Sequence, residues 1–370
     1  MTNPLLKPLS FPCGHTSPNR VWVAPMTNMQ SHPDGTLSDD ELHWLEARAT
    51  GGFGVIESCA THVSFDGQGW EGEWGIYDDS HIEGWKRAAD SMRARGSSFF
   101  AQIFHGGERA LNTEGRQPLS CVAFEDKGVK QATEADIERF IADFAAGAER
   151  AAKAGLDGVE LHGAHGYLLC QFLRADINTR QDSWGGSFDN RVRFIRSVMQ
   201  AVRARVPADF VVGVRLSPED GTFMTGLDLD ESIQTAKWLC EDGADFIHIS
   251  LWDAHVNTIK RPDVHPARAF RDALPSEVPL ITAGQLWTTE DALKQLDHGA
   301  DAVALGRAAI TTPDWPKRVV AEGLEPLMPP VSAQQLRDRA LSETFVNYMK
   351  RWPGFIHEED GGRPPRPSST

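Results

Sequence analysis

The feature that most constrains the fold is a regular alternation of short apolar runs with segments of helical periodicity. The apolar runs that read as buried strands are Arg20–Pro25, Gly54–Ser58, Phe99–Ile103, Gly158–His162, Val211–Leu216, Phe246–Ser250, Leu280–Ala283 and Ala302–Leu305. The helical segments between and after them are Asp39–Ala49, Ile82–Arg95, Thr133–Ala154, Asn190–Val206, Asp230–Glu241, Arg268–Leu274, Thr289–His298 and Pro313–Glu322. Eight strand–helix units predict an α/β protein, a parallel (β/α)₈ TIM barrel. A doubly wound open sheet is the alternative, because alternation alone does not distinguish a closed sheet from an open one.

No segment within residues 1–330 has the composition of a linker, so we expect one barrel domain there. Residues 331–370 are expected to form a C-terminal helical extension, Ala333–Lys350, and a tail rich in Pro, Gly, Arg and Ser. The long connection between Phe104 and Ala132 follows the third strand and is expected to cover the carboxyl end of the barrel.

Charge and composition exclude several classes of partner. The net charge of −15 argues against binding to nucleic acid or to an anionic membrane surface. No apolar run reaches the roughly 18 residues of a membrane span, and the N-terminus lacks a signal-peptide pattern, so we expect a cytoplasmic protein. The five cysteines form no Cys-x-x-Cys pair, which predicts no metal site.

Polar side chains gather at the predicted strand ends, where barrel enzymes hold their active sites. His162, His165 and Tyr167 leave the fourth strand within six positions, a spacing that suits general acid–base chemistry or a pair of hydrogen-bond donors. Arg215 lies within an apolar strand and is costly to bury unless it meets an anion or a polarised oxygen. The alternative for Arg215 is a buried ion pair with Glu57 or Glu160.

Two glycines and an arginine follow the last two strands and suggest a phosphate site. Gly284 follows the seventh strand, and Gly306 and Arg307 follow the eighth, which is where barrels commonly bind phosphate through backbone N–H groups. No G-x-G-x-x-G follows a strand and no Walker motif is present, so a dinucleotide or P-loop site is not predicted.

Several segments, in the same order, resemble the Old Yellow Enzyme family of flavin-dependent ene-reductases. They are Asn19–Thr27, Gln102–Arg109, Glu160–Leu169, Asn178–Arg191, Arg215–Ser217 and Leu305–Arg307, so the resemblance covers roughly residues 5–325. It implies an FMN-dependent barrel that takes electrons from NADH or NADPH. Its substrate would be the activated C=C bond of an α,β-unsaturated carbonyl compound, or a nitro compound, reduced by hydride transfer from flavin N5.

The resemblance also assigns roles. Pro25, Met26 and Thr27 would line the flavin ring, Ser58 and Gln102 would meet its pyrimidine edge, and Arg215 would lie near N1 and O2. Gly284, Gly306 and Arg307 would hold the phosphate. His162 and His165 would bind the substrate carbonyl, and Tyr167 would donate the proton.

The chain departs from the family pattern at three places. Thr27 replaces the Cys of one branch, Trp184 stands where Tyr is usual, and Lys350–Pro353 only loosely matches a segment that in some members reaches a neighbouring subunit. The sequence therefore leaves the oligomeric state open, a homo-oligomer included. It also leaves open a flavin-free barrel lyase or isomerase, with His162 or His165 as base and a phosphorylated substrate, and a catalytically silent binding protein.

Overall fold

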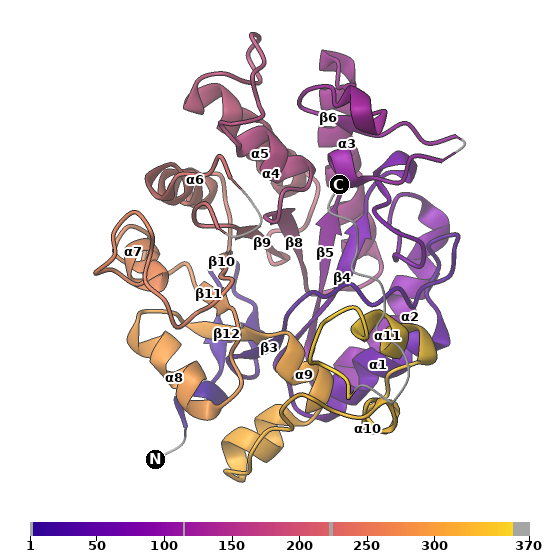
Figure 1. Ribbon diagram of the computed structural model, residues 1–370, viewed down its shortest axis with the longest axis vertical. Helices are drawn as coiled ribbons and strands as arrows, with labels where there is room; N and C mark the ends of the chain where they lie inside the picture. The colour runs from indigo at the N-terminus through magenta and orange to yellow at the C-terminus, as the bar shows by residue number, and fades with distance from the viewer. Residues whose placement is uncertain (1–2, 114, 222–224, 358–370) are drawn as a thin grey trace.

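The computed structural model describes residues 3–113, 115–221 and 225–357, and its centre is a closed barrel of parallel strands (Figure 1). Around the barrel the order is β3 (Val21–Val23), β4 (Val55–His62), β5 (Ser98–Phe104), β8 (Gly158–Gly163), β9 (Val211–Leu216), β10 (Phe246–Ser250), β11 (Leu280–Ala283) and β12 (Ala302–Leu305). Pairing of β12 with β3 closes the ring. The predicted TIM barrel is confirmed, and the open doubly wound sheet is wrong.

Backbone chemistry explains where the first two strands differ from the prediction. The N–H of Ala24 still donates to the carbonyl of Leu305 at 3.0 Å, but Pro25 has no N–H to donate, so β3 ends early. Strand β4 runs four residues past the expected Ser58 because its pairing with β5 shifts register between Glu57 and Ala60.

The barrel interior is divided into an apolar layer and a polar layer. Every second side chain of a strand faces the barrel interior, so successive interior side chains belong to successive layers. On β5, for example, Phe100 lies in the apolar layer and Gln102 in the polar layer. The apolar layer contains Leu9, Phe11, Trp22, Val55, Phe100, Val211 and Phe246, among others. Leu9 and Phe11 come from the hairpin of β1 (Leu9–Ser10) and β2 (Thr16–Ser17), which closes the amino end of the barrel. The polar layer, nearer the carboxyl end, contains Glu57, Gln102, Glu160, Arg215 and His248.

Helices surround the barrel (Figure 1). They are α1 (Asp39–Thr50), α2 (Ile82–Ala94), α3 (Glu134–Lys153), α5 (Phe188–Arg203), α6 (Leu229–Glu241), α7 (Pro266–Arg271) and α8 (Thr289–Asp297), with a π-helical segment η6 (Pro316–Ala321) after the last strand. Helix α3 begins as the sequence predicts: Thr133 and Asp136 form a reciprocal capping box. Within the described ranges, none of the helices combines the length and the apolarity that a membrane crossing requires.

Several short elements were not predicted. Helix α4 (Leu168–Leu173) follows β8, and α9 (Arg307–Thr311) follows β12. The expected helical run of the extension is two helices, α10 (Ala333–Arg337) and α11 (Glu343–Met349), separated by Ala340 at a φ of 64°. Residues 358–370 of the predicted tail lie outside the described part of the chain.

The predicted excursion between Phe104 and Ala132 contains a pair of short strands, β6 (Leu119–Ser120) and β7 (Lys130–Gln131). Short 3₁₀ turns complete the described elements: η1 (Pro4–Leu6), η2 (Phe65–Gly67), η3 (Asp79–His81), η4 (Gly107–Arg109) and η5 (Glu125–Lys127).

Candidate active site

A cavity at the carboxyl end of the barrel brings most of the predicted site residues together. It has a volume of about 70 Å³ and is lined by Pro25, Thr27, Ala60, Trp70, Gln102, His162, His165, Tyr167 and Arg215. Seven of these nine residues were singled out from the sequence, from four different strand ends and the loops after them. A second, larger cavity of about 500 Å³ lies between α1, the chain after α9 and the C-terminal extension, and none of the predicted site residues lines it.

The turn after β8 groups the two imidazoles and the phenol. His165 and Gly166 adopt φ angles of 61° and 73°, which reverse the chain and place Tyr167 at the start of α4. The His162 ring lies 5.0 Å from the His165 ring and 5.4 Å from the Tyr167 ring, measured between centroids. Three proton-carrying groups therefore face one small volume.

The surroundings of these three groups favour their neutral forms. Burial lowers the pKa of His162 well below the usual value, and nearby positive charge, including that of Arg215, lowers it further. Desolvation and the positive charge of Arg215 also lower the pKa of His165, although His165 keeps an exposed surface. Both rings are therefore neutral near pH 7, and each offers one N–H donor. Burial raises the pKa of Tyr167, although Arg109 opposes the shift, so its hydroxyl keeps its proton.

Ser250, at the end of β10, is a site residue that the sequence did not single out. Its hydroxyl lies 2.6 Å from His165 Nε2 and accepts a hydrogen bond from Arg215 Nη2 at 3.0 Å. It thereby links the imidazole after β8 to the guanidinium of β9. A single serine at a strand end is not a distinctive sequence pattern, so its contacts become visible only when the neighbouring strands of the barrel are in place.

The register shift in β4 decides which residue faces the cavity. Ser58 is fully buried, donates to the carbonyl of Cys59 at 2.7 Å and accepts from the N–H of Gln102 at 3.2 Å. Ala60 lines the cavity instead, and Ser58 does not. The bulge that moves Ala60 there has no signal in the sequence.

Four other predicted residues follow the ends of β3, β11 and β12 and do not line the cavity. Met26 is half-buried and packs next to Gly306, where an added Cβ would meet its sulfur at 3.4 Å. Gly284 has a φ of +150°, and a Cβ there would lie 2.5 Å from the carbonyl oxygen of Leu251, so only glycine fits. Arg307 is exposed, with its guanidinium 5.9 Å from the centre of the Trp287 ring.

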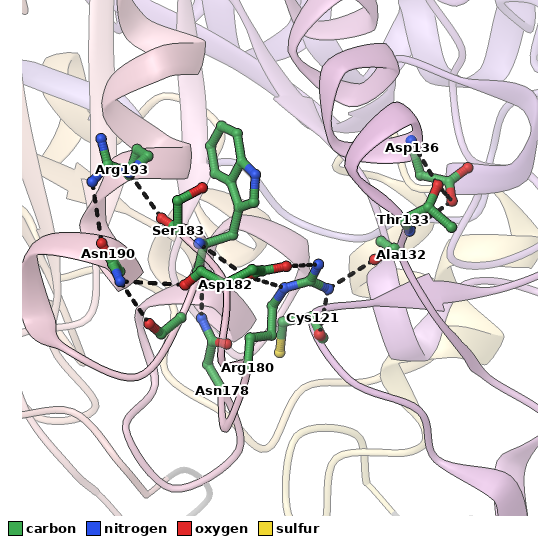
Figure 2. A network of polar contacts seen from close by, with 12 residues as sticks. Cys121, Ala132, Thr133, Asp136, Asn178, Arg180, Asp182, Ser183, Asn190 and Arg193 are labelled. Atoms are coloured by element: carbon green, nitrogen blue, oxygen red, sulfur yellow. Dashed lines mark hydrogen bonds and ion pairs between the residues drawn. The ribbon is translucent and has the colours of Figure 1, made fainter.

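Arg180 holds the two arms of the excursion after β5 together, through the network that Figure 2 shows. Arg180 Nη1 donates to the carbonyls of Cys121 at 2.9 Å and Ala132 at 2.8 Å, on the two arms of the excursion. Its Nε and Nη2 donate to the carboxylate of Asp182, at 3.1 and 2.6 Å. The Asn178–Arg191 segment therefore acts as an anchor, and its side chains do not line the cavity.

Two further contacts connect the excursion and the C-terminal extension to the site. Arg109, in η4, donates to the carbonyl of His165 at 3.0 Å and lies 5.2 Å from the centre of the Tyr167 ring. On the other side, Tyr348 of α11 hydrogen-bonds the side chain of Thr27, so the C-terminal extension reaches the cavity wall within a single chain.

Comparison with known proteins places the chain in a family. Residues 4–325 match the model of the NADH:flavin oxidoreductase / NADH oxidase family. The probable NADH-dependent flavin oxidoreductase YqiG of Bacillus subtilis is 37% identical over 335 residues, covering 87% of this chain and 89% of the relative. Two other relatives are longer proteins, of which the chain spans 36% and 33%.

Two solved structures share the architecture. An Old Yellow Enzyme homologue from Zymomonas mobilis is 28% identical with a TM-score of 0.79, covering 93% of this chain and 99% of that one. Morphinone reductase is also 28% identical, with a TM-score of 0.77 and coverage of 98% and 99%. The resemblance inferred from the sequence is confirmed.

Proposed function

The chain belongs to the NADH:flavin oxidoreductase / NADH oxidase family, FMN-binding enzymes that use NADH or NADPH, and on this premise we propose that it reduces the activated C=C bond of α,β-unsaturated carbonyl or nitro compounds. The observation that carries the proposal is the convergence of His162, His165 and Tyr167 on one cavity with Gln102 and Arg215. The flavin-free lyase or isomerase loses its support, because this family binds a flavin.

The residues around the cavity fit FMN. Pro25, Met26 and Thr27 would line the ring system, and Gln102 would meet its pyrimidine edge. Buried Arg215 Nε has no hydrogen-bond partner among the described residues, which leaves it for a ring oxygen or nitrogen. Gly284, Gly306 and Arg307 would hold the phosphate. When bound, FMN would accept hydride from the nicotinamide and deliver it from N5 to the alkene.

The imidazole pair would polarise the substrate. His162 and His165 are neutral, their ring centroids lie 5.0 Å apart and both line the cavity, so each would offer a donor to one carbonyl or nitro oxygen. Negative charge develops on that oxygen as the β-carbon gains hydride, and each preorganised donor in such a position is worth roughly 3–4 kcal/mol. The pair therefore orients the substrate and stabilises its enolate.

Tyr167 would supply the proton. Its raised pKa keeps the hydroxyl protonated, and its ring is held edge-on to Phe104 at 4.6 Å. A neutral phenol can protonate the substrate α-carbon without carrying charge at rest.

The proposal is tested by the chromophore and its reactions. Heat-released chromophore from the purified protein should co-elute with FMN, and NADH or NADPH should bleach it without oxygen. Addition of cyclohexenone should restore the oxidised spectrum and yield cyclohexanone. A colourless protein, release of FAD, or a bleached protein that no enone or nitroalkene reoxidises would refute the proposal.

A further inference from the structure

The polar layer of the barrel contains a carboxylate, Glu160, that is hydrogen-bonded to Gln102, a side chain predicted to bind the flavin. Glu160 is fully buried on β8, and Gln102 is its neighbour on β5, where the two residues are paired across the strands. Gln102 Nε2 donates to Glu160 Oε1 at 2.7 Å. The second carboxylate oxygen, Oε2, lies 2.7 Å from His248 Nδ1.

This contact determines which end of the Gln102 amide faces the cavity. A carboxylate only accepts hydrogen bonds, so it must meet the NH₂ group and not the carbonyl oxygen of the amide. Gln102 lines the cavity, and its Oε1 receives no hydrogen bond from the described residues. The Gln102 side chain therefore offers its Oε1 as a hydrogen-bond acceptor to a ligand in the cavity.

We propose that Glu160 is a positioning residue that makes Gln102 a hydrogen-bond acceptor and so selects the N3–H donor of the flavin pyrimidine ring. The inference rests on the proposed function for the place of the flavin. The pyrimidine edge offers one donor, N3–H, between two carbonyl acceptors, O2 and O4. An amide turned the other way would leave N3–H without a partner and would donate to one of those carbonyls instead.

The same layer contains a matched control. Glu57 is equally buried on β4, and neither of its carboxylate oxygens has a hydrogen-bond partner among the described residues. One oxygen each from Glu57 and Glu160 and one His248 nitrogen lie within 4.8 Å of one another. Glu57 therefore shares the charge environment of Glu160 but not its contact with Gln102. The Glu57→Gln substitution therefore changes the charge of the polar layer and keeps the contact between Glu160 and Gln102.

The experiment observes the N3 proton directly, in holoenzyme exchanged with ¹⁵N-labelled FMN. In the wild type the N3–H resonance should be shifted downfield by its acceptor. In Glu160→Gln and Glu160→Asp, the Gln102 amide loses its carboxylate partner or can rotate so that its NH₂ group faces the cavity. The resonance should then move upfield, and its exchange with solvent should become about 2- to 10-fold faster, the effect of one lost hydrogen bond. Glu57→Gln should leave the resonance in place.

Glu160→Asp keeps the charge and shortens the side chain by one methylene, so agreement of the two Glu160 variants assigns the effect to the contact. An N3–H resonance that is unshifted in the wild type, or that moves equally in Glu57→Gln, overturns the inference. Should the Glu160 variants not fold, the wild-type shift still decides whether Gln102 is an acceptor. Flavin retention and enone reduction test the proposed function separately, so a protein that binds FMN and reduces enones can still refute the role of Glu160.

Discussion

Replacing Tyr167 by Phe should separate the two halves of the proposed reaction. The substitution removes one hydroxyl and keeps the ring, so the edge-on contact with Phe104 at 4.6 Å is retained. Arg109 stays tied to the carbonyl of His165 at 3.0 Å whether or not the hydroxyl is present. The fold should therefore lose no more than the roughly 0.5–1.5 kcal/mol of one hydrogen bond.

The effect on catalysis should be much larger and confined to one half-reaction. Hydride transfer from the nicotinamide to the flavin needs no proton donor, so anaerobic bleaching should proceed at nearly the wild-type rate. Reoxidation by an enone needs a proton at the α-carbon, and loss of a general acid typically costs about 10²–10⁴-fold. Solvent can replace part of this, so we expect reoxidation to slow by at least about 10-fold.

Anaerobic stopped-flow absorbance of the flavin measures both rates on the same sample. Tyr77→Phe is the matched control, because the Tyr77 hydroxyl donates to the carbonyl of Asp34 at 3.2 Å and its side chain does not line the cavity. Equal slowing of both halves in Tyr167→Phe would indicate a general disturbance of the pocket. An unchanged rate of reoxidation would remove Tyr167 from proton transfer.

Three further substitutions test other parts of the site. Arg215→Met should make the flavin midpoint potential more negative, because a cation near N1 and O2 favours the anionic reduced ring; a potential that is unchanged or higher would contradict that placement. Arg180→Ala should lower the free energy of urea unfolding by about 2–4 kcal/mol, since the carbonyls of Cys121 and Ala132 lose their donor, whereas exposed Arg193→Ala should cost about 0.5 kcal/mol. Burial lowers the pKa of His162, so the unfolded chain binds more protons than the folded chain below about pH 6.5, and stability is lost as the pH falls below that value. His162→Asn should remove up to about 1.4 kcal/mol per pH unit from this dependence, and identical pH profiles of unfolding would show that His162 is not held neutral.

Local spacing in the sequence predicted an α/β fold of eight strands and three of the groups that line the cavity. The eight apolar runs correspond to β3, β4, β5, β8, β9, β10, β11 and β12, because the alternation of apolar and turn residues is a property of each segment alone. His162, His165 and Tyr167 could be predicted as one group because they leave the same strand. The predicted segment Thr133–Ala154 also matches α3 to within one residue at each end, and Thr133 is the residue that caps this helix.

Tertiary structure alone decided how residues from different strands meet. Ser250 joins His165 and Arg215, and Glu160 turns the amide of Gln102, through contacts that span 85, 35 and 58 positions of the chain. The bulge that gives Ala60 the place expected for Ser58 depends on how β4 pairs with β5. Closure of the barrel sets these registers, and a segment read by itself carries no information about the stagger of its neighbours. The sequence therefore indicates which chemical groups the site contains, and the closed sheet decides which atom of each group faces the cavity.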